Sequence, residues 1–198
     1  MDIQKIKTYL QQEYGNEKTI EELAPNNHIN CKETAFDYDE MKRQVVKDQC
    51  DSADALYITK WFNFIELKTG FDKCENGVNE RTHKENLKLR IRLKAYESIA
   101  LFEKVILPKG GFEENEINGK RRFVAVIDTK EAPLEGVTDI LAELSGCKDA
   151  VPNYKKDLHK WLSDSLLYYR KEFDGKHIFY DDTQVWYDYE VNQKINRI

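Results

Sequence analysis

The chain has 198 residues, of which 34% are charged and 40% hydrophobic, and its formal net charge is −5. This composition is typical of a soluble globular protein, and the length fits one domain that can bury a hydrophobic core. The negative net charge argues against a protein that coats nucleic acid non-specifically, although it is compatible with a local basic patch.

Neither a membrane span nor a metal-binding motif of cysteines or histidines is visible in the sequence. No apolar stretch approaches the length of a membrane-spanning helix, and residues 1–5 show no signal-peptide pattern, so we expect a cytoplasmic protein with no membrane partner. The cysteines form no C-x-x-C pair and the histidines no ligand spacing, which predicts neither a zinc site nor a disulfide framework.

The first part of the chain is predicted to be helical. Apolar residues recur at helical spacing over 2–14, and Gly15 ends this run. A short helical turn follows Thr19. A second helix is predicted over about 34–47, with an apolar face that includes Tyr38.

An antiparallel hairpin is predicted over residues 53–67. Two short runs rich in β-branched and aromatic residues, 53–58 and 61–67, are joined by Thr59-Lys60. The sequence places Asp54 at the start of the first strand, and Glu66 and Lys68 at the end of the second. Because side chains alternate along a strand, Glu66 and Lys68 project to the same side. A carboxylate and an ammonium at the end of an apolar strand are costly unless they share a partner, and a metal ion with water and a phosphodiester is one such partner.

Asp54, the apolar run and Phe64-Ile65-Glu66-Leu67-Lys68 together resemble the core motif of the PD-(D/E)xK nuclease superfamily, which has the restriction-endonuclease-like fold. The resemblance implies that Asp54 and Glu66 bind Mg²⁺ or Mn²⁺, and that Lys68 lies beside the attacking water. Ala53 stands where the motif has proline. The alternative is a half-exposed hairpin on which Glu66 and Lys68 form a surface ion pair that contributes little.

The resemblance also implies that a helix before the hairpin contributes a further acidic residue. Asp37, Asp39 and Glu40 are the candidates. On the predicted helix, Glu40 points away from the apolar face, whereas Asp37 and Asp39 flank it. The spacing does not choose among them, and all three are equally compatible with solvated surface positions.

A long helix is predicted over about 82–106, ended by Pro108. Two apolar stripes are expected along it, which predicts packing on more than one side. The first comprises Leu87, Ile91, Ala95, Ile99, Phe102 and Ile106, and the second comprises Leu89, Leu93, Tyr96 and Ala100.

The N-terminal half of this helix is basic, and we expect it to contact nucleic acid. The candidate residues are Lys84, Lys88, Arg90, Arg92 and Lys94. Such side chains can bind phosphates without reading base sequence, or they can simply keep the protein soluble. The resemblance implies that one basic residue approaches the scissile phosphate, and Lys94, or Arg90 one turn earlier, matches that position.

The remaining chain predicts a strand, two helices and a second hairpin. The strand covers 122–128, with Asp128 a weak site candidate, and the helices cover 139–144 and 154–173. The hairpin is predicted between 177–180 and 184–191. Its aromatic residues are Phe179, Tyr180, Trp186, Tyr187 and Tyr189.

Together these elements predict an α/β domain with a central mixed β-sheet flanked by helices. We expect one nuclease-like domain over 1–198, with a restriction-endonuclease-like core at about 34–130 and an extra C-terminal helix and hairpin at about 154–192. The expected function is metal-dependent hydrolysis of phosphodiester bonds. DNA is the commoner substrate of the superfamily, RNA is not excluded, and a homodimer is compatible with cutting two strands.

Two other functions are compatible with the sequence. A nuclease fold can serve as a catalytically inactive binding or assembly module, because fold does not imply function. Alternatively, the aromatic C-terminal hairpin could dock a protein partner, which would require a large exposed aromatic patch.

Overall fold

The computed structural model describes the backbone of residues 3–15, 17–25, 29–47, 50–68, 80–113, 119–127, 154–167 and 179–198. The side chains of residues 80–84 and 154 are not described. The predicted helix over 139–144, Asp128 and the side chain of Lys84 therefore lie outside the described residues.

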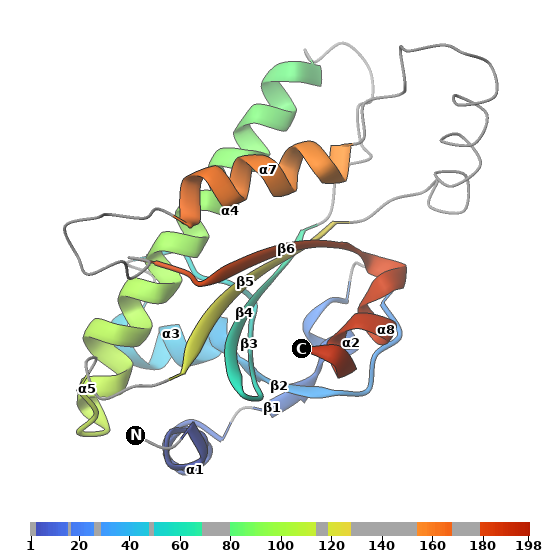
Figure 1. The fold of residues 1–198 in the computed structure, drawn as a ribbon. Helices are drawn as coiled ribbons and strands as arrows, with labels where there is room; N and C mark the ends of the chain where they lie inside the picture. Colours follow the sequence, from blue (N-terminus) through green and yellow to red (C-terminus); the bar gives the residue numbers. More distant parts are fainter. Residues whose placement is uncertain are drawn as a thin grey trace, which may run out of the picture.

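A six-stranded mixed sheet forms the centre of the molecule, as expected (Figure 1). The strands lie in sequence order across the sheet. The first four strands alternate in direction, whereas the last three run parallel to one another. The strands are β1 (Glu17–Thr19), β2 (Thr34–Asp37), β3 (Ala55–Ile58), β4 (Trp61–Lys68), β5 (Lys120–Ile127) and β6 (Asp182–Tyr187).

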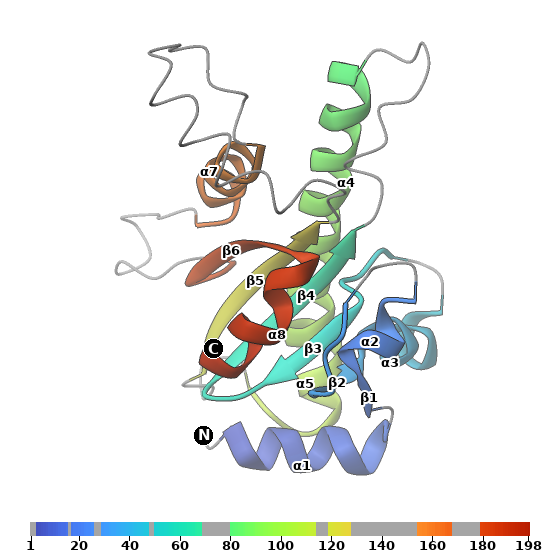
Figure 2. The same cartoon turned by 90° about the vertical axis from the view of Figure 1, so that its right-hand side faces the viewer.

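Helices cover both faces of this sheet (Figures 1 and 2). The long helix α4 and helix α7 lie against one face, here called the α4 face, and α2 and α8 lie against the other, the α8 face. The helices are α1 (Ile3–Glu13), α2 (Ile20–Leu23), α3 (Tyr38–Val46), α4 (Glu80–Leu101), the π-helix η1 (Phe102–Ile106), α5 (Leu107–Lys109), α7 (Tyr154–Leu166), the 3₁₀-helices η5 (Asp188–Glu190) and η6 (Ile195–Arg197), and α8 (Val191–Lys194).

The predicted hairpin is confirmed as β3 and β4. Ala55 pairs with Ile65, and Ile58 with Phe62, on either side of the Thr59-Lys60 turn. Asn63 braces the turn, because its side-chain amide donates to the carbonyl of Tyr57 at 2.9 Å. Alternation then sends Phe62 and Phe64 into the core of the α4 face, and Ile65 into the core of the α8 face.

The order strand, strand, helix, strand is also confirmed. α4 follows β4 and leads into β5, which pairs in parallel with β4 over its full length. A parallel pair requires such a crossover, because a tight turn cannot join two strands that run in the same direction. α4 consequently lies across the face that carries Phe64 and Glu66.

Only one of the two apolar stripes expected on α4 is buried. The first stripe, from Leu87 to Ile106, faces the sheet. The second stripe is confirmed only in part: Leu89 is 48% exposed and Leu93 is 46% exposed, whereas Tyr96 is partly buried and its hydroxyl donates to the carbonyl of Ser165 in α7 at 2.8 Å. Sequence periodicity identifies apolar faces of a helix but does not say which of them meets a neighbour.

The helix predicted over 34–47 begins four residues later than expected, because its first four residues form a strand. Residues 34–37 form β2, and α3 begins only at Tyr38. The carboxylate of Asp37 accepts the backbone N–H of Glu40 at 2.9 Å, so Asp37 is the N-cap of α3. Ala35 and Phe36 are buried between neighbouring strands, and this sheet pairing overrides the helical pattern.

The predicted C-terminal hairpin was wrong, because the strand at 182–187 does not pair with the segment just before it. β6 pairs in parallel with β5, and the residues after it form η5, α8 and η6. α7 supports this arrangement, because His159 Nε2 lies 2.8 Å from the carbonyl oxygen of Thr183. Trp186 and Tyr187 are buried inside the protein, whereas Tyr189 is 49% exposed, so only part of the aromatic surface of this segment faces solvent.

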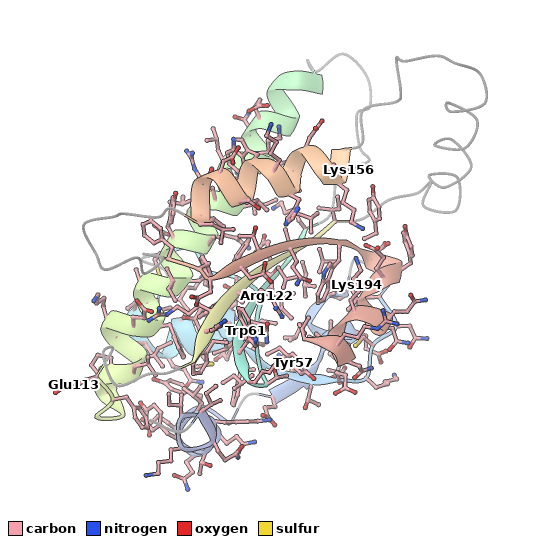
Figure 3. All side chains as sticks on the ribbon, in the orientation of Figure 1. Tyr57, Trp61, Glu113, Arg122, Lys156 and Lys194 are labelled. Carbon is pink, nitrogen blue, oxygen red and sulfur yellow. The ribbon has the colours of Figure 1, made fainter. Side chains whose placement is uncertain are left out.

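A polar cluster holds β4, β5 and β6 together on the α8 face (Figure 3). The guanidinium of Arg122 lies 4.3 Å from the centre of the Trp61 ring. It also donates to Asp182 at 2.6 Å and to Asn63 at 3.4 Å. These contacts satisfy Arg122 inside the protein, on the face opposite to Glu66.

The difference between the two stripes of α4 can be tested with one substitution at two positions. We expect Leu87→Ala to lower the free energy of unfolding by about 2–5 kcal/mol, because Leu87 of the first stripe is 7% exposed and its loss leaves a cavity. Leu93→Ala on the same helix should change it by no more than about 0.5 kcal/mol. Urea denaturation measures both, and equal effects would contradict the orientation of α4.

Candidate active site

Asp54 and Glu66 lie next to each other on the α4 face. The backbone N–H of Asp54 donates to the carbonyl of Ile65 at 3.0 Å, which continues the β3–β4 register by one residue. Asp54 is therefore opposite Glu66, and opposite residues of antiparallel strands project to the same side. The Asp54 carboxylate also accepts the backbone N–H of Leu67 at 2.5 Å, which fixes its orientation.

Lys94 reaches these two carboxylates from α4. Its Nζ lies 3.2 Å from Asp54 Oδ1 and 2.9 Å from Glu66 Oε2. The neighbours Ile91 and Ala95 are buried against the sheet, and this packing sets the direction in which Lys94 projects. One ammonium thus bridges carboxylates from two adjacent strands.

Ser98 fixes the helix relative to the strands at this point. Its hydroxyl donates to the carbonyl of Lys94 at 2.6 Å and accepts the backbone N–H of Ala53 at 2.7 Å. Ser98 therefore joins the backbone beside Asp54 to the turn of α4 that carries Lys94. The hydroxyl of Tyr180 adds a hydrogen bond to the carbonyl of Ala95 at 2.7 Å.

The three charged side chains differ in exposure. Glu66 is 1% exposed, whereas Asp54 and Lys94 are 21% and 20% exposed. The alternative of a half-exposed hairpin with a surface Glu66–Lys68 pair is therefore contradicted. Asp54 and Lys94 form the accessible side of the site, and Glu66 forms its interior.

Burial raises the pKa values of both carboxyl groups. Burial, followed by the charge of Asp54, raises the pKa of Glu66 to about 8, and Lys94 opposes this rise. Burial also raises the pKa of Asp54, against the opposing effects of Lys94 and the Leu67 N–H. For Lys94, burial lowers the pKa, but Glu66 and Asp54 more than offset it, so the pKa is raised. The carboxylates therefore need positive charge between them to ionise together.

Lys68 lies on the same face as Glu66, two residues further along β4. It is half-buried, and its charge adds to the effect of Lys94 in opposing the burial that raises the pKa of Glu66. Within the described part of the chain, the Lys68 ammonium makes no hydrogen bond or ion pair. It therefore acts on Glu66 through its charge without being held by that carboxylate, in contrast to Lys94.

Of the three upstream acids, the structure brings only Asp39 near the site. Asp37 pairs in register with Ala55, so it projects to the α8 face, where it binds Lys18 at 2.7 Å. Glu40 forms an exposed pair with Arg43. Asp39 accepts the hydroxyl of Ser52 at 2.5 Å, and its negative charge adds to the burial that raises the pKa of Asp54.

The basic residues of α4 divide between two sides of the helix. Lys88 pairs with Glu85, and Arg92 stacks on Trp161 of α7, 5.2 Å from the ring centre. Arg90 is exposed and lies one turn before Lys94, so these two share a side. Arg92 thus lies toward α7, whereas Arg90 lies on the side of α4 that carries Lys94.

The donor set fits one divalent cation. Mg²⁺ binds through one or two carboxylates and keeps several waters, and Asp54 and Glu66 supply two carboxylates whose repulsion a cation relieves. Among the residues that the structure describes, no group of three or more His, Cys, Asp or Glu side chains gathers as a metal site. Any metal here would therefore depend on water or substrate oxygens for its remaining ligands.

The sequence did not reveal the roles of Lys94 and Ser98 in this arrangement. Lys94 was expected to contact phosphate, and its apolar neighbours were the only sign that it turns inward. Nothing in the sequence pointed to Ser98, because its function depends on where α4 crosses the strands.

In comparisons with known proteins, no family model matches this chain, no curated protein matches it, and no solved structure matches it. Within the described helices, none combines the length and apolar character that crossing a membrane requires.

The raised pKa of Glu66 gives a pH-dependent difference between the natural protein and Glu66→Gln. The folded protein holds this proton up to about pH 8, whereas the unfolded chain releases it near 4.5. Between these values the unfolded state binds fewer protons, so stability falls as pH rises. Glutamine is always neutral, so the variant should gain stability relative to the natural protein across this window.

Urea denaturation of both proteins at a series of pH values measures this difference. Asp164→Asn, on the exposed side of α7, is the matched control and should show no such trend. A difference between the natural protein and Glu66→Gln that stays constant over the whole window would contradict the burial of an ionisable Glu66.

Proposed function

We propose that this protein is a metal-dependent nuclease of the PD-(D/E)xK type, with a restriction-endonuclease-like core formed by β3, β4, α4 and β5. The observation that carries the proposal is the meeting of Asp54 and Glu66 on one sheet face around a single positive charge. Lys68 on the same face completes the three residues of the motif. The strand order and the parallel crossover through α4 support the same interpretation.

The site residues have separate roles in the proposed reaction. Asp54 and Glu66 would hold Mg²⁺ or Mn²⁺, and the bound metal would stabilise charge on the phosphate and acidify a water molecule. Lys68 would orient that water and favour its deprotonated form, because its ammonium is near Glu66 without an ion-pair partner among the described residues. Leu67 N–H keeps the Asp54 carboxylate turned toward Glu66.

The proposed substrate is nucleic acid, with DNA favoured because it is commoner in the superfamily that the motif resembles. Arg90 and Lys94 form the positively charged side of α4 next to the carboxylates. An exposed arginine there can bind a backbone phosphate and position the strand without reading its sequence.

Cleavage assays test the proposal. Purified protein is incubated with plasmid, linear duplex, single-stranded DNA and RNA, with Mg²⁺ or Mn²⁺ and with chelator. We expect metal-dependent cleavage of at least one substrate. Glu66→Gln and Asp54→Asn should each lower the rate at least about 100-fold, because each removes a charged ligand at the reacting centre.

Lys68→Ala should also lower the cleavage rate, and Asp164→Asn serves as the control that leaves it unchanged. Circular dichroism of each variant separates loss of chemistry from loss of fold. Cleavage that persists in chelator, or in both carboxylate variants, would rule out the proposed centre.

The role of Arg90 has its own measurement. Arg90→Ala should weaken nucleic-acid binding to a similar extent for every sequence, and should reduce the slope of log affinity against log salt by about one. Fluorescence anisotropy over a range of salt concentrations, in Ca²⁺ to prevent cleavage, measures both. An unchanged slope would show that Arg90 contacts no phosphate.

One observation favours a second function, the catalytically inactive binding or assembly module. Lys94 already satisfies both carboxylates, and such an ion triad can be purely structural. In that case no substrate would be cleaved under any metal condition, although the protein would be folded.

A further inference from the structure

We infer that Lys94 is an exchangeable counter-ion, which occupies the place between Asp54 and Glu66 until a divalent cation displaces it. The inference rests on the proposed function, since it concerns what stabilises the two carboxylates of the same site before a metal ion binds to them. It concerns the resting form of the site, which the E-x-K motif does not specify.

The geometry places the ammonium where a bridging cation would bind. Nζ lies 3.2 Å from Asp54 and 2.9 Å from Glu66, so it contacts one oxygen of each carboxylate. A divalent cation that bridged the same carboxylates would occupy the same space. The two cations therefore exclude each other from this position.

The charges of the site favour the exchange. When both carboxyl groups are ionised, two carboxylates and one ammonium leave one net negative charge in a partly buried place, and isolated buried charge is unfavourable. Replacing the ammonium with a divalent cation makes the carboxylate centre neutral. The positive charge of Lys94 is then free to bind an anion.

The exchange needs movement of a side chain and not of the helix. The backbone of Lys94 is held by Ser98, and its neighbours Ile91 and Ala95 are buried. The side chain, in contrast, is 20% exposed and has a flexible four-carbon stem. Its ammonium can therefore turn toward the side of α4 that carries exposed Arg90.

The displaced ammonium would stay beside the metal centre. There it would meet the phosphate oxygens of a bound substrate, together with Arg90. Lys94 would thus stabilise the carboxylates before metal binding and the substrate anion after it. A fixed structural lysine would remain between Asp54 and Glu66 under all conditions.

Metal affinity distinguishes exchange from a fixed structural role. Isothermal titration calorimetry with Mn²⁺, at a pH of about 9 where carboxyl groups ionise readily, compares the natural protein with Lys94→Met and Lys94→Gln. Without a competing ammonium, both variants should bind Mn²⁺ about tenfold more tightly or better, and tenfold corresponds to about 1.4 kcal/mol.

Lys18→Met is the matched control. It also removes a lysine from a carboxylate, that of Asp37, but on the opposite face of the sheet. The net charge of the protein changes equally, so a general electrostatic effect would appear in both variants. Lys18→Met should leave the Mn²⁺ affinity close to that of the natural protein, and Glu66→Gln should abolish the binding.

A second measurement uses only the natural protein, so it does not depend on the folding of any variant. Amine acylation, followed by peptide mass spectrometry, reports the reactivity of each lysine. Mn²⁺ should increase the acylation of Lys94 several-fold, because its ammonium leaves the carboxylates for solvent. The acylation of Lys18 should not change.

The outcomes separate this inference from the proposed function. Tight Mn²⁺ binding in the Lys94 variants and metal-induced acylation of Lys94 support exchange. Metal binding by the natural protein without either effect overturns exchange but leaves the proposed metal centre intact. Absence of Mn²⁺ binding in the natural protein and in every folded variant overturns both.

Discussion

The contact of one ammonium with two carboxylates is the interaction on which the rest of the site depends. Glu66 is almost fully buried, and burial makes ionisation of both Glu66 and Asp54 unfavourable unless a positive charge lies between them. The mixed sheet supplies the two carboxylates from adjacent positions, and α4 supplies the ammonium. Ser98 holds these two parts in register, since its hydroxyl bonds both to α4 and to the backbone beside Asp54.

The surrounding core explains why this polar centre persists. Phe64, one pleat from Glu66 on the same face, packs against the rings of Tyr38, Phe102 and Tyr180. Phe102 is the first residue of η1, which continues α4, so this aromatic layer joins β4 to the helical segment that carries Lys94. A buried ion triad is weak evidence for stability, because apolar residues often replace one without loss.

Local patterns predicted the parts of the molecule that depend on neighbouring residues. The β3–β4 hairpin and the shared face of Glu66 and Lys68 followed from alternation, and the buried stripe of α4 followed from helical periodicity. Features that depend on distant contacts were not predictable. The helical pattern of residues 34–37 did not predict that Asp37 projects to the opposite face of the sheet. The parallel pairing of β6 with β5 joins two segments that are far apart in the sequence, with α7 between them. Likewise, the contact of Lys94 with both carboxylates depends on the position of α4, which no single-sequence pattern reports.

The central claim is that Asp54 and Glu66 form a cation centre that takes a divalent metal. Crystals grown with Mn²⁺ and measured near its absorption edge test this claim most directly, because the anomalous signal locates the ion itself. We expect a peak between the two carboxylates, at about 2.1 Å from an oxygen of each. An anomalous map with no peak between them, from crystals of protein that cleaves nucleic acid in the same Mn²⁺ buffer, would contradict the account.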